Sequence, residues 1–150
     1  MLIHCRHDYG SVELTVCEAE PKTSVVPSVR LRALVDVEGA RVMRSAWFSL
    51  AALEALAGAA ERPAEAEVAI ESFTPGDLAI IVAGAGVRFH CAWVPASGLL
   101  RASFDARFET GELPKLGAWL RKLLKPGYLE ALRYYDYDEE LCDDSDGKAP

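Results

Sequence analysis

The sequence has no apolar run long enough to span a bilayer as a helix, which takes roughly 18 residues. Its longest run, Leu78–Val87, contains two glycines and suits a strand followed by a turn. Nor does Met1–Asp8 show the positive charge and apolar segment that mark a secretory leader. We therefore expect no secretory leader, no membrane contact and a cytoplasmic location.

Cysteine and histidine are scarce, with four and three residues among 150. The cysteines are far apart, and a chain of this length folds without disulfides, which favours a reduced setting. No two cysteines have the short gap that is typical of structural zinc sites. Alternation on a strand points His4 and His7 to opposite faces and separates Cys91 from His90. We therefore expect no metal and no cofactor, and the sequence leaves open whether His4, Cys5, His90 and Cys91 meet as a site.

Catalytic signatures are missing as well. The sequence has no serine elbow, no HExxH pair and no glycine loop for phosphate, and Gly84-Ala85-Gly86 fits a hairpin turn. A nucleophilic cysteine needs a base beside it, and His90 and Cys91 face apart. A pairing of Cys5 or Cys17 with His90 stays open, although nothing marks either thiol as reactive. We predict that the protein is not an enzyme.

Basic residues are outnumbered, with 16 Lys and Arg against 23 Asp and Glu and a net charge of −7. This balance argues against direct binding of nucleic acid, which needs a concentrated basic surface. The charge is uneven, because residues 134–150 hold seven acids against Lys148, whereas residues 1–133 hold 16 acids and 15 bases. The sequence predicts a single α+β domain over 1–133 and an acidic, flexible tail over 134–150.

Alternating apolar and polar residues predict strands in the first half of the chain, at 12–17, 29–37 and 40–48, with a turn at Glu38-Gly39. The stretch that contains His4 and His7 adds an N-terminal strand. Helical spacing then begins after Ser49, a candidate N-cap, and ends at Pro63.

The second half repeats this order, with strands at 66–73, 78–83, 87–94 and 100–108 and a helix at 113–124, for which Thr110 is the expected N-cap. Four strands, a helix, four strands and a helix predict an α+β fold. We expect a mainly antiparallel sheet of about eight strands, built from hairpins and a meander, with two amphipathic helices packed on it.

The tail interleaves tyrosines with acids. Tyrosines anchor an interface at low entropic cost, and clustered carboxylates attract a cationic partner. We also expect a short helix within Tyr128–Tyr137 that places Leu129 and Leu132, and at its far end Tyr135, on the body. The candidate partner-binding residues are Tyr135, Asp136, Tyr137, Asp138, Glu139 and Glu140.

Two segments lead from a strand into a helix, namely Trp47-Phe48-Ser49-Leu50 and Arg107-Phe108-Glu109-Thr110. Their layout over residues 29–124 resembles small cytoplasmic immunity proteins of bacterial polymorphic-toxin systems, of the WapA-cognate type. The resemblance implies a protein without catalytic residues that occludes a toxin domain. The leading hypothesis is therefore a non-enzymatic protein-binding module, an immunity protein or inhibitor, whose partner has a basic surface.

Two other hypotheses belong to different classes. The first is a small-molecule-binding or enzymatic α+β domain with a pocket around Arg88, His90 and Arg101, with His4 and Arg107 on the same wet side of their strands. The second is a homodimer that pairs through an open sheet face. An enclosed, concave site would favour the enzyme, and an open surface would argue against it.

We expect deletion of residues 134–150 to leave the melting temperature nearly unchanged, because a segment so rich in acids buries little apolar surface. Thermal unfolding of the full and shortened chains measures the difference. A collapse of stability in the shortened chain would show instead that the segment packs on the body.

Overall fold

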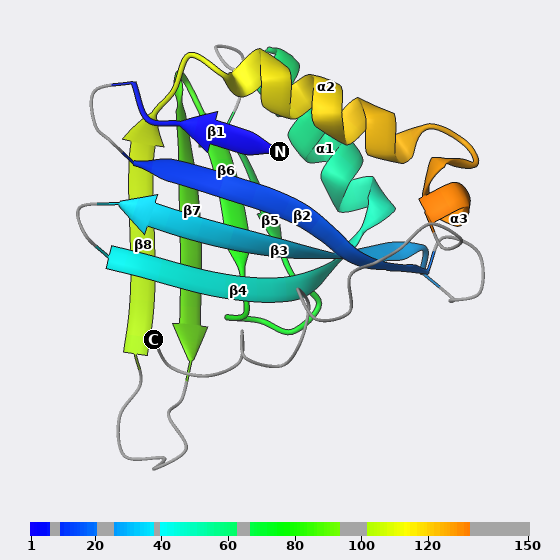
Figure 1. Ribbon diagram of the computed structural model, residues 1–150, viewed down its shortest axis with the longest axis horizontal. Coiled ribbons are helices and arrows are strands. Elements are labelled where there is room, and N and C mark those ends of the chain that lie inside the picture. The colour runs from blue at the N-terminus through cyan, green and yellow to red at the C-terminus, as the bar shows by residue number, and fades with distance from the viewer. Residues whose placement is uncertain (7–9, 21–25, 38–39, 63–66, 94–101, 133–150) are drawn as a thin grey trace.

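Two four-stranded antiparallel sheets make up most of the computed structural model, which describes residues 1–6, 10–20, 26–37, 40–62, 67–93 and 102–132 (Figure 1). In each sheet the strands lie in the order in which they occur in the chain. The N-terminal sheet contains β1 (Leu2–His4), β2 (Ser11–Glu20), β3 (Ser28–Val37) and β4 (Ala40–Ser49).

The C-terminal sheet is a second meander with tight turns. Between its first two strands, the amide of Asp77 donates to the carbonyl of Thr74 at 3.2 Å. Gly76 and Gly84 have φ angles of 92° and 57°, a left-handed conformation that favours glycine. The expected hairpin turn at 84–86 is therefore confirmed, and a second turn lies at 74–77. The strands are β5 (Val68–Glu71), β6 (Ala79–Ala83), β7 (Gly86–Trp93) and β8 (Ala102–Glu109).

The helices are α1 (Leu50–Glu61), α2 (Leu113–Leu124) and the short α3 (Tyr128–Leu132). The hydroxyl of Ser49 accepts from the amide of Ala52 at 3.0 Å, which confirms this N-cap. The expected N-cap at Thr110 is wrong, because α2 starts after Glu112 and the Thr110 hydroxyl accepts from the amide of Glu112 in the preceding turn. None of the described helices has the length and apolar character needed to cross a membrane.

The expected single sheet of about eight strands is wrong, because α1 separates β4 from β5 and the two meanders form separate sheets. In Figure 1 the strands of the N-terminal sheet run across those of the C-terminal sheet. The two apolar faces share one core, in which Phe48 of β4 and Phe89 of β7 are fully buried. Two short helices cannot cover the apolar face of eight strands, whereas two sheets cover each other.

The helices α1 and α2 approach each other closely at Gly117. A Cβ atom at this position would lie 3.1 Å from Cγ of Glu61 and 3.6 Å from the carbonyl oxygen of Ala57. An ion pair joins the same helices, with Nε of Arg121 2.7 Å from Oε1 of Glu61. By contrast, a Cβ atom at Gly58 of α1 would meet nothing within 4 Å.

We expect Gly117→Val to lower the free energy of unfolding by about 1–3 kcal/mol, because the added side chain meets α1 in a packed interface. The matched change Gly58→Val adds the same side chain at a position where a Cβ atom meets nothing within 4 Å. It should change the free energy of unfolding by only a few tenths of a kcal/mol. Urea unfolding measures both. Equal effects of the two substitutions would contradict the close approach of the helices.

Candidate functional site

The candidate partner-binding residues Tyr135, Asp136, Tyr137, Asp138, Glu139 and Glu140 lie outside the described residues. The structure does place the point at which this part of the chain begins. The last described residue, Leu132, ends α3, and α3 lies against β2 and α2. Leu129 is buried and Leu132 is partly buried, which confirms that α3 packs these two residues on the body.

An open groove with a volume of about 380 Å³ lies beside α3. It runs between β2 on one side and α2 and α3 on the other, and we call it the root groove because residues 133–150 follow directly from its wall. The residues that line it are Met1, Glu13, Leu14, Thr15, Val16, Trp119, Leu123, Tyr128 and Leu132.

The root groove is of mixed character, because the Met1 ammonium group, the Glu13 carboxylate and Thr15 line it together with apolar side chains. Leu14 and Leu123 are buried, whereas Val16, Trp119 and Tyr128 are only partly buried and pack against the core. Glu13 is exposed. Such a surface can bury an apolar side chain from another molecule while a carboxylate attracts a cation nearby.

Local contacts hold the walls of the root groove in place. Gly127, with a φ angle of 83°, turns the chain between α2 and α3. The amide of Tyr128 donates to the carbonyl of Lys125 at 3.1 Å, and Nζ of Lys122 lies 5.6 Å from the centre of the Tyr128 ring. On the β2 side, the pairing with β3 shifts register between Val16 and Glu18, which indicates a bulge next to the groove.

The N-terminus also lines the root groove. The Met1 ammonium group donates to the carbonyl of Leu14 at 2.8 Å, and the amide of Leu14 donates back to the carbonyl of Met1 at 2.8 Å. Burial lowers the pKa of the Met1 ammonium group below its ordinary value, and Glu13 works in the opposite direction. Met1 is therefore a fixed part of the groove.

Sequence reasoning missed the root groove, because its residues come from four separate segments. Two patterns pointed to parts of it, namely the apolar stripe of residues 113–124, which includes Trp119, and the expected short helix after Tyr128. Neither pattern says that β2 lies opposite.

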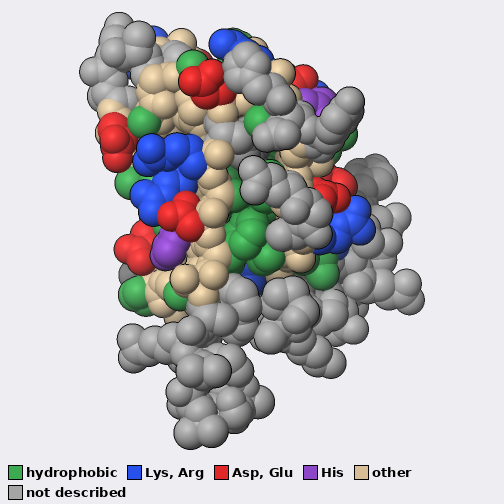
Figure 2. Space-filling model, turned by 90° about the vertical axis from the view of Figure 1, so that its left-hand side faces the viewer, with side chains coloured by type: hydrophobic (Ala, Val, Ile, Leu, Met, Phe, Trp, Pro, Cys, Tyr) green, Lys and Arg blue, Asp and Glu red, His purple; other side chains and the backbone are tan. Residues whose placement is uncertain are grey.

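A second polar cluster lies on the outer face of the C-terminal sheet, and we call its residues, Arg88, His90, Asp105 and Arg107, the arginine face. Arg88 lies directly across from Arg107, and His90 across from Asp105. Nε of Arg88 donates to Oδ1 of Asp105 at 2.7 Å, and Nη2 of Arg88 bonds to Oδ2 of the same carboxylate. Figure 2 shows Arg or Lys, acidic and His side chains side by side on this side of the molecule.

The charges of the arginine face affect one another. The hydrogen bond from Arg88 lowers the pKa of the Asp105 carboxyl, and the same bond raises the pKa of Arg88. Nδ1 of His90 lies 3.9 Å from Oδ2 of Asp105. Arg107 adds a second positive charge beside this group, since the pairing of β7 and β8 places like charges opposite each other.

The surface around the arginine face is open. A hollow of about 260 Å³ lies beside Arg88 and Arg107, with Glu67 and Glu109 also in its lining. The side chains of Arg88 and His90 remain 36% and 39% exposed, and Arg101 lies outside the described residues. Arg88 and His90 therefore share a face, as alternation predicted, but not an enclosed pocket.

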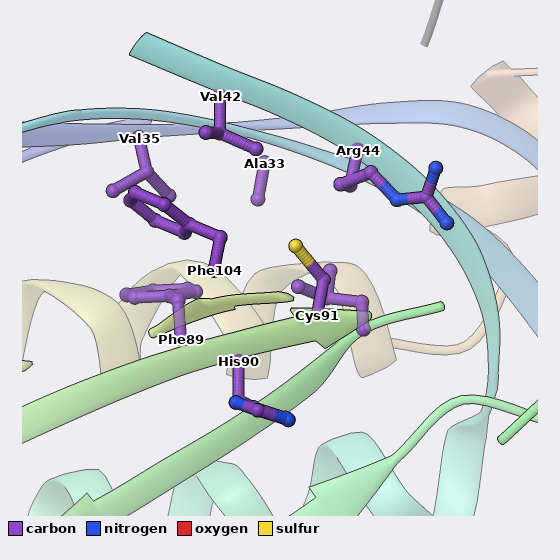
Figure 3. Close-up of a pocket in the computed structure, with 9 residues that line it drawn as sticks. Ala33, Val35, Val42, Arg44, Phe89, His90, Cys91 and Phe104 are labelled. Atoms are coloured by element: carbon purple, nitrogen blue, oxygen red, sulfur yellow. The ribbon is translucent and has the colours of Figure 1, made fainter. Parts of the chain in front are cut away.

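Among the described residues, His4, Cys5, His90 and Cys91 do not come together as a site, and Cys17 is disulfide-bonded, contrary to the expected reduced setting. His4 is exposed on β1, where its amide donates to Oε2 of Glu112 at 2.5 Å. Cys91 is buried between the two sheets near Phe104 and Arg44, whereas His90 points away from it (Figure 3). Burial raises the pKa of the Cys91 thiol, which disfavours a thiolate. Within the described ranges, no group of three or more His, Cys, Asp and Glu residues is arranged to hold a metal ion.

Comparison with models of known protein families gives no match for this chain, and no curated protein sequence matches it either.

We expect Asp105→Asn to lower the melting temperature slightly at about pH 7 and not at about pH 2. Since the folded-state pKa of Asp105 is lowered, its stabilising effect is present above the ordinary value of 3.8. The effect is lost as the pH falls through the lowered folded-state pKa, because protons bind more readily to the unfolded chain. Thermal unfolding at both pH values measures it, and added salt should reduce it.

Glu71→Gln, which removes another exposed carboxylate on an outer strand of the same sheet, is the matched control and should change little at either pH. A deficit of the Asp105→Asn variant that persists unchanged at the acidic pH would contradict the ionic origin of the effect.

Proposed function

We propose that this protein is a non-enzymatic binding module that uses the acidic segment 134–150 to hold a protein with a basic surface. One observation carries the proposal. The segment with seven acids and one base begins two residues after Leu132, where α3 ends, and α3 forms a wall of the open root groove. The described part of the chain therefore ends, before this segment, at a groove whose lining includes Trp119 and Tyr128, and aromatic residues are enriched in protein interfaces.

The physical mechanism combines long-range attraction with short-range contact. Carboxylates attract a cationic partner over about a Debye length, which is roughly 8 Å at physiological salt. Tyr135 and Tyr137 supply large side chains that lose little conformational freedom when they are buried. Because residues 1–133 are nearly neutral, their charge neither adds much to this attraction nor opposes it.

The resemblance to immunity proteins of polymorphic-toxin systems gives this proposal a more specific form. The partner is then a toxin or effector domain with a basic surface, as is common among toxins that act on nucleic acids. Binding of the two-sheet body beside such a surface blocks access to the toxin sterically, and the acidic segment opposes the partner's positive charge.

The alternative of a small-molecule site or enzyme around Arg88 and His90 has less support. The hollow beside Arg88 is open, and the guanidinium group of Arg88 is already hydrogen-bonded to Asp105. Ligand sites usually enclose most of a small molecule and keep their polar groups directed at it.

We expect the combined substitution Asp136→Asn, Asp138→Asn and Glu140→Gln to weaken capture of the partner at least tenfold, because it removes three of the seven acids that attract it. Each variant is used as bait in extracts of the cells that make the protein, at low and physiological salt. Captured proteins are quantified by mass spectrometry, and their net charge is compared.

The matched control removes three acids elsewhere, with Glu54→Gln, Glu67→Gln and Glu71→Gln, all at exposed positions. It should capture the same basic partner as the unaltered chain. Equal capture by the segment variant and the unaltered chain, or a captured partner with an acidic surface, would overturn the proposed function.

A further inference from the structure

We propose that the outer face of the N-terminal sheet is a docking surface for the chain's own acidic segment, residues 134–150, which a disulfide between Cys17 and Cys142 joins to β2. This contact goes beyond the proposed function, because it joins two parts of one chain and does not depend on a basic partner. Where both hold, Arg32 and the partner compete for the same carboxylates.

Arg32 lies on the outer face of the N-terminal sheet, in the middle of β3. The register places it between Thr15 of β2 and Ser45 of β4. Its chain neighbours Leu31 and Ala33 face the core and are buried there. Because successive side chains of a strand point to opposite faces, and because Thr15 and Ser45 are small, this position by itself predicts an exposed guanidinium group.

Arg32 is nevertheless buried, with only 7% of the residue exposed. Arg88 holds the matching place on the outer face of the C-terminal sheet, on its third strand, and the side chain of Arg88 stays 36% exposed. The strand neighbours of Arg88, Ile81 and Arg107, are larger than those of Arg32. Since smaller neighbours accompany the greater burial, another part of the chain covers Arg32.

The part that covers Arg32 has to supply negative charge. A buried guanidinium group keeps its charge, and its burial is costly without a carboxylate beside it. By register, Glu13 and Glu18 are the nearest acids in the described part of this face. Glu13 is exposed, and the side chain of Glu18 is 52% exposed and bonded to Arg30 at 3.2 Å. A carboxylate buried together with Arg32 therefore comes from elsewhere in the chain.

Composition singles out residues 134–150 among the segments outside the described residues. They hold seven acids and one base. By contrast, residues 21–25 and 94–101 each contain one base and no acid, and residues 7–9, 38–39 and 63–66 each contain one acid. The acidic segment is thus the best match for a buried arginine.

Cys17 points to the same segment independently of charge. The chain has four cysteines, of which Cys17 is disulfide-bonded while Cys5 and Cys91 are free thiols. Within one chain this leaves Cys142 as the partner, and Cys142 belongs to the acidic segment. Since β2 pairs with β3, the strand of Arg32, the disulfide ties the segment to this sheet.

The length of the chain after α3 permits this path. Leu132, the last residue of α3, lines the root groove together with Thr15 and Val16 of β2. Cys142 follows ten residues later. Ten extended residues span up to about 33 Å, and neighbouring strands lie only about 4.8 Å apart. The segment can therefore reach both Cys17 and, one strand further, Arg32.

Peptide mapping tests the disulfide. The full chain is purified without reductant, its free thiols are alkylated, and it is cleaved for mass spectrometry. We expect a linked pair of peptides that contain Cys17 and Cys142, with Cys5 and Cys91 alkylated. An alkylated Cys142, or a link between two copies of the chain, would overturn the proposed tether.

Trp47 reports the docking itself. It lies across from Arg30 on the same outer face and is partly buried. With Trp93→Phe and Trp119→Phe, Trp47 is the only tryptophan left of three. In the Cys142→Ser form of this chain the tether is absent, so about 1 M salt should weaken the docking and shift the Trp47 emission to longer wavelength. With the disulfide intact, the same salt should leave the emission nearly unchanged.

The matched control is Cys5→Ser, which removes a free thiol and keeps the tether, so its Trp47 emission should not respond to salt. Circular dichroism shows that each variant is folded. If salt leaves the emission of the Cys142→Ser form unchanged, docking on the arginine-bearing face is wrong. If the emission depends on protein concentration, a second copy covers the face, which also overturns the docking. Capture of a basic partner tests the proposed function separately.

Deletion of residues 134–150 gives a further readout. The docking predicts a fall in melting temperature of about 5 °C or more, because the shortened chain uncovers Arg32 and loses the disulfide. This result is the opposite of the expectation from the sequence alone. An unchanged melting temperature would therefore contradict the docking and leave the segment as an independent tail.

Discussion

The mutual burial of two apolar sheet faces is the constraint on which the rest of this structure depends. Each four-stranded meander has one apolar face, and neither α1 nor α2 is long enough to cover it. Phe48 and Phe89 reach complete burial because the sheets face each other. The helices then close the open side of the core, where Gly117 lets them approach closely. The root groove lies where β2 faces α2 and α3.

Sequence periodicity predicted the local structure well and the arrangement of the layers poorly. Alternation identifies which side chains of a strand share a face, as at β8, where Asp105 and Arg107 are exposed and Ala106 is buried. It does not say what covers the apolar face. The same alternation is compatible with one sheet under helices or with two sheets in contact, and only the three-dimensional path of α1 decides. The predicted N-cap at Thr110 was wrong for a related reason. A turn precedes α2, and the Thr110 hydroxyl accepts a hydrogen bond within that turn.

For the candidate site too, some parts could be predicted from the sequence and others could not. A local excess of acids can be read directly from residues 134–150, because charge is a property of composition. The root groove cannot be read from the sequence, because only the fold brings its four segments together. These segments contain Met1, Thr15, Trp119 and Tyr128. Separation of His90 from Cys91 was predictable, because neighbours on a strand point to opposite faces. The open surface around Arg88 could not be predicted in this way, because it depends on the other strands of the sheet.

On the proposed function, the acidic segment and the root groove have different tasks. Attraction between exposed charges mainly raises the rate of association and weakens with salt. An apolar contact in a preformed groove mainly slows dissociation and is nearly independent of salt. The arginine face fits this division, because Arg88 and Asp105 neutralise each other across the strands and add little to the field at a distance. The acidic segment follows soon after Leu132, which lines the groove that also contains Trp119 and Tyr128, so the chain enters this segment on that side of the molecule.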